Sequence, residues 1–95
     1  MPDYILLMHD DVEPDDAAWE PYVANLMERG CFQGGSAIGK GVTLRKVGAP
    51  EPLTNIAGFI RISAENLGRA RELVAGNPTF EAGGTVEVRE LPETD

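Results

Sequence analysis

The sequence predicts an α+β domain with a ferredoxin-like βαβ(β)βαβ order of elements, spanning residues 1–95. Short runs typical of strands alternate with two stretches that carry apolar residues at helical spacing. Two such βαβ units form an antiparallel sheet with both helices on one face. The other face then needs a cover, so we expect a homodimer that packs sheet against sheet, a dimeric α+β barrel.

The first strand and the first helix are predicted in the N-terminal third of the chain. Tyr4–His9 (YILLMH) is short and apolar on both faces, as is typical of a central strand covered on both sides. A turn near residues 14–18 precedes a helix from about residue 19, with Asp15 or Asp16 as N-cap and Gly30 after its last turn. The apolar stripe of this helix consists of Trp19, Tyr22, Val23, Leu26 and Met27.

Two strands are predicted next, over Cys31–Ser36 and Val42–Val47, with Gly39–Gly41 as the turn between them. The stretch Gly34–Gly41 (GGSAIGKG) differs by one residue from a phosphate-binding P-loop, because Gly41 replaces the metal-binding Ser or Thr. The alternating run VTLRKV follows it as a predicted strand, where a P-loop requires a helix. We therefore interpret the glycines as a hairpin rather than a nucleotide site.

The C-terminal half is predicted to contain a strand, a helix and a strand. Asn55–Ser63 includes the alternating run GFIRIS, and Asn66 is a candidate N-cap for the second helix. Residues 76–78 (GNP) are expected to end that helix. Gly84–Leu91 alternates with one polar face, which is typical of an edge strand. The apolar stripe of the second helix consists of Leu67, Ala70, Leu73 and Val74.

The composition disfavours several classes of function. Sixteen acidic against eight basic residues give a net charge of −8, which would repel nucleic acid and anionic membranes. Cys31 is the single cysteine, so no cysteine-rich metal site can form. We expect neither a metal site nor a cofactor. No run approaches the roughly 20 apolar residues of a membrane span, and no basic flank precedes Tyr4–Met8. We therefore expect a cytoplasmic protein.

The C-terminal half resembles the YCII-related family, which includes the DGPF-domain proteins. The resemblance is carried by GFIRIS, by Asn77-Pro78 after the helix, by Ala82-Gly83, and by the closing strand VEVREL. It implies a ferredoxin-like homodimer with a pocket between the sheet and the partner subunit. The DGPF-type loop is missing, and Ala49–Ala57 (APEPLTNIA) corresponds to it. Some relatives have a His in the first helix as half of a proposed His–Asp pair; Trp19 stands there, so that pair does not carry over.

Three groups of residues are candidates for a site. His9 lies at the end of a predicted central strand, and Asp11 is a better-placed carboxylate partner than Asp10 for acid–base catalysis. A His at a strand end beside solvated acids is, however, more often without a catalytic role. Arg61 shares a strand face with Phe59 and could bind an anionic ligand. Trp19 and Tyr22 could line a pocket, but at helical spacing such residues are more often core.

The sequence leaves two classes of function open. One is a small-molecule-binding homodimer, with His9 and Asp11 as possible catalytic residues and Arg61, Phe59, Trp19 and Tyr22 as ligand contacts. The other is a non-catalytic interaction or regulatory module that acts through its dimer surface. The sequence alone identifies neither a substrate nor a reaction.

Overall fold

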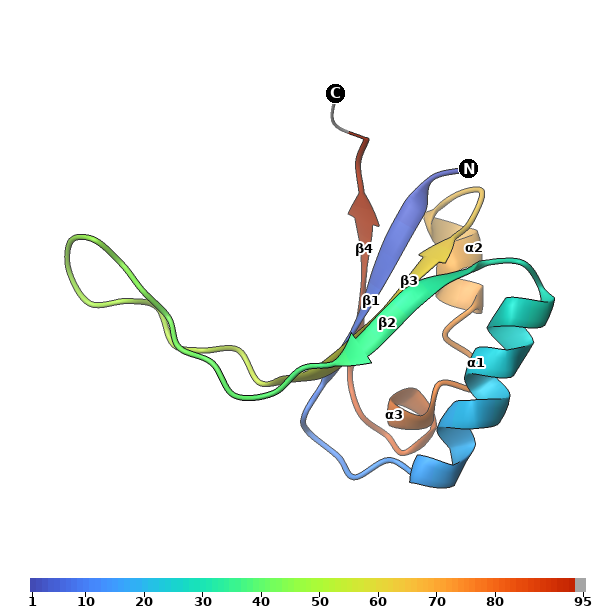
Figure 1. Ribbon diagram of the computed structural model, residues 1–95, viewed down its shortest axis with the longest axis horizontal. Helices are drawn as coiled ribbons and strands as arrows, with labels where there is room; N and C mark the ends of the chain where they lie inside the picture. The colour runs from blue at the N-terminus through green and yellow to red at the C-terminus, as the bar shows by residue number, and fades with distance from the viewer. Residues whose placement is uncertain (94–95) are drawn as a thin grey trace.

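The structure is a computed structural model that describes residues 1–93; Thr94 and Asp95, the end of the predicted domain 1–95, lie outside the described residues. Within this range, four strands form one antiparallel sheet in the order β2-β3-β1-β4, and the helices lie on one of its faces (Figure 1). The predicted ferredoxin-like α+β fold is confirmed. The strands are β1 (Asp3–His9), β2 (Phe32–Ala37), β3 (Ile56–Ser63) and β4 (Val86–Leu91).

The helices η1 (Asp16–Ala18) and α2 (Leu67–Glu72) begin at residues whose side chains cap them. The short helix η1 has Asp15 as its N-cap, whose carboxylate accepts a hydrogen bond from the Ala17 N–H at 3.0 Å, and α1 (Trp19–Glu28) follows directly. In α2, the Asn66 side chain accepts from the Arg69 N–H at 2.9 Å. The predicted turn, helix start and Asn66 cap are thus correct.

A third helix, α3 (Pro78–Glu81), occupies the segment that was predicted only to end the second helix. The Asn77 Oδ1 accepts hydrogen bonds from the backbone N–H groups of Thr79 (3.0 Å) and Phe80 (3.3 Å), and Pro78 takes the first helical position. Asn77 is fully buried. The GNP segment therefore starts a helix turn that packs below the sheet.

The hydrophobic core lies between the sheet and the helices. Leu6 and Ile62 are 0% exposed, and Leu26 of α1 covers them at 1% exposure. The Tyr22 hydroxyl donates to the Leu73 carbonyl oxygen at 2.7 Å, which ties α1 to the end of α2. Burial of this phenol raises the pKa of Tyr22 to about 12, while the Asn77 amide opposes the shift.

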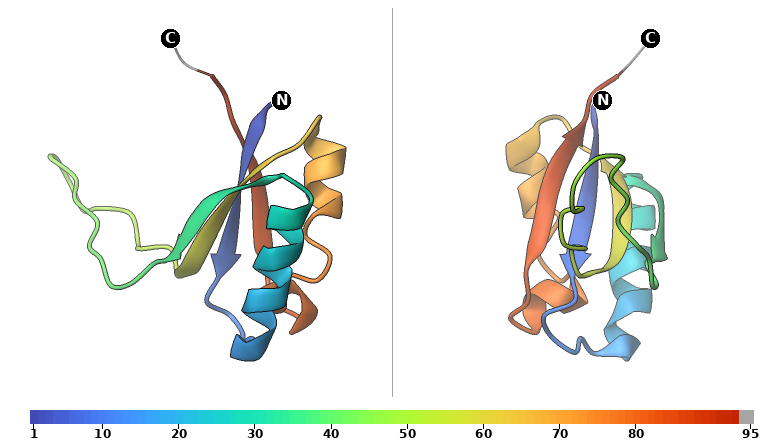
Figure 2. Two further views of the ribbon diagram at one scale, coloured as in Figure 1. Left: turned by 45° about the vertical axis from the view of Figure 1, so that its right-hand side comes forward. Right: turned by 90° about the vertical axis from the view of Figure 1, so that its left-hand side faces the viewer.

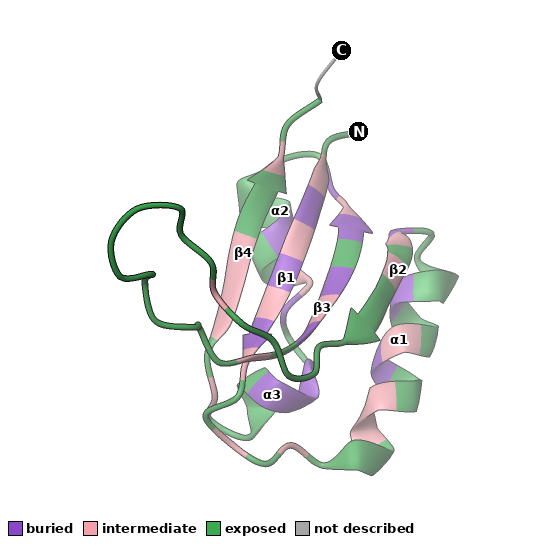
Figure 3. Cartoon of the chain, turned by 60° about the vertical axis from the view of Figure 1, so that its left-hand side comes forward, coloured by how far each residue is buried: buried purple, intermediate pink, exposed green. Residues whose placement is uncertain are grey.

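The two faces of β1 are covered unequally. Tyr4, Leu6 and Met8 are buried against the helices, while the residues between them are only half-buried, and Figure 3 shows this alternation along the strand. The prediction that β1 is central is confirmed, but a single chain covers it on one side only. We call the sheet surface opposite the helices the open face; its apolar centre is formed by Ile5, Leu7 and Phe59.

The predicted strand over Val42–Val47 is wrong. Residues 38–55 form an extended segment without a strand, which we call the arm; it leaves the sheet after β2 and returns at β3 (Figures 1 and 2). At its base the Ile38 N–H donates to the Ala57 carbonyl oxygen at 2.9 Å. Alternating VTLRKV fits a half-buried strand, but a strand needs a neighbour for its backbone groups, and the described chain supplies none.

Candidate functional site

A cavity of about 430 Å³ lies between the sheet and the N-terminal half of α1. The helix contributes Trp19 and Val23, and the strands contribute the opposite wall. Most of the lining atoms belong to apolar groups, which is typical of small-molecule sites. The remaining lining residues are Met8, Pro14, Asp16, Phe32, Gly35, Ser36, Ala37, Ala57, Gly58, Phe59, Ile60 and Thr79.

Glycines of β2 and β3 shape the sheet wall of this cavity. The pairing of the two strands shifts between Phe32 and Gly35, where β2 carries one extra residue, and Gly34 has φ +113°. A Cβ on Gly35 would lie 2.6 Å from the Phe59 carbonyl oxygen, so only glycine allows the strands this close. Of the glycines that resembled a P-loop, Gly34 and Gly35 lie within this bulged edge strand, and no helix follows them. Gly39 and Gly41 belong to the arm, so the predicted hairpin turn between two strands is wrong.

Few polar groups face the cavity. Thr79 is 2% exposed, whereas Ser36 pairs with Phe59 and directs its hydroxyl to the open-face side, where it donates to the Ala37 carbonyl oxygen at 2.9 Å. Among the lining residues described, Asp16 is the one ionisable side chain. The cavity can therefore hold an apolar molecule and offer it a few hydrogen bonds, but its walls contain no pair of groups for acid–base chemistry.

The sequence placed a pocket between the sheet and a dimer partner, whereas the cavity formed by the chain itself lies on the helix side. Trp19, one of the predicted ligand contacts, lines this cavity; Phe59, another, borders it from β3, but its side chain points to the open face. Tyr22 lies behind Trp19 in the core, with their ring centroids 6.5 Å apart in an edge-to-face arrangement. Only part of the predicted contact set is therefore brought together.

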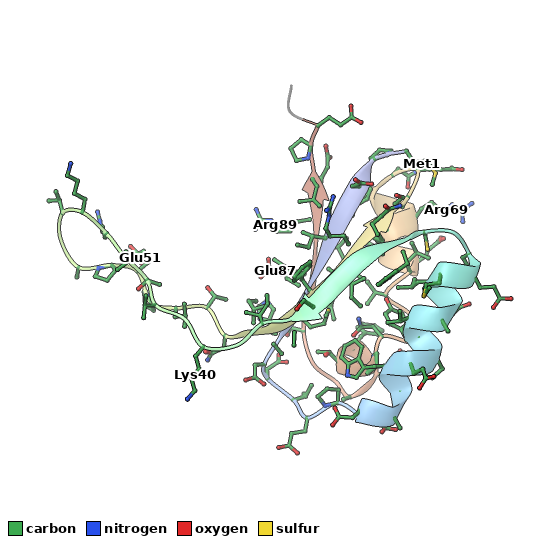
Figure 4. All side chains as sticks on the ribbon, viewed as in Figure 1. Met1, Lys40, Glu51, Arg69, Glu87 and Arg89 are labelled. Atoms are coloured by element: carbon green, nitrogen blue, oxygen red, sulfur yellow. The ribbon has the colours of Figure 1, made fainter. Side chains whose placement is uncertain are left out.

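The partner of His9 is Glu87, not Asp11 as predicted. The His9 Nε2 lies 2.8 Å from the Glu87 Oε1, across the ladder between β1 and β4 on the open face. The hydrogen bond to His9 is the main cause that lowers the pKa of Glu87, and Arg89, 3.6 Å from its other oxygen, adds to it. Figure 4 shows Glu87 and Arg89 on β4, projecting away from the helices. This pair therefore lies on the face opposite the cavity.

Asp11 has a structural contact in the loop after β1. Both of its carboxylate oxygens lie 3.2 Å from the Thr85 backbone N–H, just before β4 begins. Hydrogen bonds to Thr85 lower the pKa of Asp11. The Asp11 carboxylate thereby fixes the start of β4. The place beside His9 that the sequence assigned to Asp11 is taken by Glu87.

Arg61 also lies on the open face. Its guanidinium is 3.5 Å from an Asp3 carboxylate oxygen, and the Ser63 hydroxyl donates to the other Asp3 oxygen at 3.1 Å. Phe59 belongs to the same strand, two residues away, but borders the cavity as well. The predicted Arg61–Phe59 face exists, and its arginine is engaged by a neighbouring carboxylate.

Neither a metal site nor a membrane-spanning helix is found in the described part of the chain. Residues 1–93 contain no group of three or more His, Cys, Asp or Glu side chains arranged to hold a metal ion. None of the helices in this range is long and apolar enough to span a membrane.

Sequence reasoning missed Glu87 and most of the cavity wall. Glu87 is 78 residues from His9, and only the register of β1 with β4 brings the two together. Met8 and Thr79 belong to segments far apart in the sequence, and their meeting at the cavity depends on how α3 packs. The sequence did contain a signal for α3, because Asn followed by Pro is a common way to start a helix.

Comparison with known proteins supports the fold. No protein-family model matches the chain, and no curated protein sequence matches it. Among solved structures, a 5-chloro-2-hydroxyhydroquinone dehydrochlorinase from Burkholderia phenoliruptrix, in complex with 2,5-dihydroxybenzoquinone, superposes with a TM-score of 0.58 at 16% identity. The match covers 97% of this chain and 95% of that chain. At this identity the likeness shows a shared α+β fold over essentially the whole length.

Proposed function

We propose that the protein is a YCII-related homodimer that binds a small, planar, largely apolar molecule in the cavity between α1 and the sheet. The cavity itself carries this proposal. Its volume of about 430 Å³ falls in the range of small-molecule sites, roughly 300–1,000 Å³. The YCII-related motifs quoted above and the fold shared with the dehydrochlorinase support the assignment of family.

The walls of the cavity favour a neutral aromatic ligand. Trp19 and Phe32, which both pack against the buried core, offer ring surfaces for stacking or edge-to-face contact. Asp16 at the rim and the net charge of −8 disfavour an anion. The structural neighbour is known in complex with 2,5-dihydroxybenzoquinone, a small ring compound, which is consistent with a ligand of this size and shape.

Binding is better supported than turnover. The His9–Glu87 pair lies on the open face, so it cannot reach a molecule held on the helix side of the sheet. The catalytic role of His9 and Asp11 stays a prediction, and it would require a second site at the open face. There, replacing His9 by Ala would abolish turnover without changing affinity at the cavity.

The open face supports the homodimer. Ile5, Leu7 and Phe59 form an apolar centre that one chain leaves half-exposed, flanked by the ion pairs of Arg61 and Glu87. Apolar centres with polar rims are typical of subunit interfaces. Sedimentation at micromolar concentration is expected to give a dimer; a stable monomer of about ten kilodaltons would contradict this part of the proposal.

The ligand site is tested through Trp19, the single tryptophan of the chain, whose indole N–H gives one resonance in an NMR spectrum. Titration with benzene-1,4-diol is expected to shift this resonance together with the backbone signals of Gly35 and Gly58. Replacing Val23 by Phe fills the cavity and should weaken binding by about 10-fold or more, since sub-ångström overlaps are costly in close-packed sites.

The matched control is Met27→Phe, one helical turn from Val23 on an exposed part of α1. It should bind like the parent protein. If neither the Trp19 resonance nor those of the sheet glycines respond to the diol or to 2,5-dihydroxybenzoquinone, the cavity does not bind ligands of this class.

A further inference from the structure

Because of the arm, residues 38–55, the chain is less compact than a folded domain of the same length. A folded domain of this length has a radius of gyration of about 12 Å, whereas this chain has 14.6 Å. Its accessible surface of 6742 Å² exceeds the roughly 5,300 Å² expected for a compact chain of this mass. In the left view of Figure 2 the arm stands away from the sheet. The excess area is of the order that one partner buries in a stable interface, about 800 Å² or more.

Apolar side chains lie along this arm without cover. Val42, Leu44 and Val47 are 79%, 90% and 76% exposed, and they come from the alternating run that resembles a strand. Single exposed apolar residues are normal on a protein surface. Three exposed apolar residues in one extended segment, alternating with polar residues, are unusual. They indicate an apolar strip that a partner covers.

The charge of the arm is opposite to that of the rest of the chain. Both lysines of the chain, Lys40 and Lys46, lie on it with Arg45, against the single acid Glu51, so the arm carries +2. The remaining residues must then carry −10 of the total of −8. Arg45 has its contacts inside the arm, 4.0 Å from Glu51 and 3.2 Å from the Ala49 carbonyl oxygen. Figure 4 shows Lys40 pointing away from the body.

The direction of the arm identifies its partner. In Figure 1 the helices lie on one side of the sheet and the arm projects on the other, which is the side of the open face. A second copy packed on the open face would therefore stand beside the arm. That copy also presents carboxylates that a basic segment would contact, including Glu87 of β4 on its open face.

We propose that the arm is an intersubunit clamp: it lies on the acidic body of a second copy of this chain, covering Val42, Leu44 and Val47 and pairing its basic side chains with carboxylates there. The inference rests on the homodimer proposed above and assigns it a second contact besides the open face. By two-fold symmetry each copy contributes one arm and receives one.

A cross-linking experiment tests the direction of this contact. Unlabelled and ¹⁵N-labelled protein are mixed, left to exchange subunits, and treated with a carbodiimide that joins lysines directly to carboxylates. Because both lysines are on the arm, every lysine link reports on it. Links from Lys40 or Lys46 to body carboxylates are expected to join one labelled and one unlabelled peptide. Links confined to Glu51 within one copy would overturn the proposal.

Substitutions on the arm test its contribution to association. The double variant Val42→Glu and Leu44→Glu changes residues that are exposed in the single chain, so folding is retained. Losing the burial of two aliphatic side chains should weaken the dimer by about 100-fold or more, measured by sedimentation across a concentration series. The matched control is Met27→Glu, another exposed apolar position on α1, which should leave the dimer unchanged.

The outcomes separate the arm from the rest of the proposed function. If the arm variant and Met27→Glu dimerise equally well, the clamp is refuted while the dimer through the open face stands. If the parent protein is itself a monomer, both the dimer and the clamp fail, but the response of Trp19 to benzene-1,4-diol is unaffected.

Discussion

Leu6 and Leu7 are consecutive residues of β1, and they show how differently the two faces of the sheet are covered. Leu6 is completely buried under the helices, whereas Leu7 is half-buried between Phe59 and Glu87 on the open face. Helices of the same chain cover the helix side of the sheet, and the cavity lies between them and the sheet. The open side has an apolar centre and two groups of ion pairs, and no part of residues 1–93 covers it. Folding therefore depends on the helix-covered face, and the proposed homodimer would depend on the open face.

The largest expected effect separates these faces directly. Leu6→Ala should destabilise the monomer by about 3–4 kcal/mol, because it leaves a cavity in a close-packed core. Leu7→Ala should cost less than about 1.5 kcal/mol in dilute protein, because its side chain already meets solvent. Urea denaturation at low and at high protein concentration measures both.

At high concentration the cost of Leu7→Ala should rise, because the second copy of the proposed homodimer would then cover the open face. Leu6→Ala should show the same loss at both concentrations. Equal losses for the two variants in dilute protein would mean that the two faces do not differ in the way the structure indicates.

The body of the fold was predictable from sequence because its signals are local. Periodicity located β1, α1, β3 and β4, and the caps at Asp15 and Asn66 lie where their side chains suggested. The site was less predictable. The meeting of His9 with Glu87 follows from strand register, and register depends on the whole sheet rather than on either segment.

The error over Val42–Val47 has a different cause. Alternating apolar and polar residues indicate that one side of a segment is covered, but they do not say by which chain. Within one copy, the covering surface is absent and the segment remains extended without a ladder. For Trp19 the sequence allowed two roles, a core residue or a pocket residue. The structure gives it both, because Trp19 packs against the core and also lines the cavity.

A smaller effect is expected at the helix side in alkaline solution. The folded-state pKa of Tyr22 is raised to about 12 from its ordinary value of 10.0, so the unfolded chain loses this proton first as the pH rises. The stability that depends on the neutral phenol is complete below pH 10 and is lost between pH 10 and about 12.

Tyr22→Phe should remove this part of the alkaline loss. At neutral pH the variant should be about 1 kcal/mol less stable, because the hydrogen bond to the Leu73 carbonyl oxygen is gone. Thermal unfolding at steps from pH 8 to 12 measures both effects. If the two proteins lose stability in parallel above pH 10, Tyr22 is not the group responsible.

The smallest effect is expected at the open face in acid. The pKa of Glu87 is lowered from its ordinary value of 4.5, chiefly by the hydrogen bond with His9. The stabilisation therefore exists above pH 4.5 and disappears as the pH falls through the lower folded-state value. Glu87→Gln should flatten this part of the acid profile of unfolding.

Glu90→Gln, on the same strand and exposed, is the matched control and should retain the profile of the parent protein. A Glu87→Gln protein with an unchanged acid profile would show that the pair with His9 makes no contribution on this face.

The position of the arm between two paired strands makes it an exchangeable part of the molecule. The sheet holds both of its ends through the contact of Ile38 with Ala57, and each doubling of a loop adds only about 0.6 kcal/mol to the cost of closing it. Its length and sequence can therefore vary among related chains without disturbing the core or the cavity. Such variation would let closely similar chains acquire different assembly partners while they keep the same core and cavity.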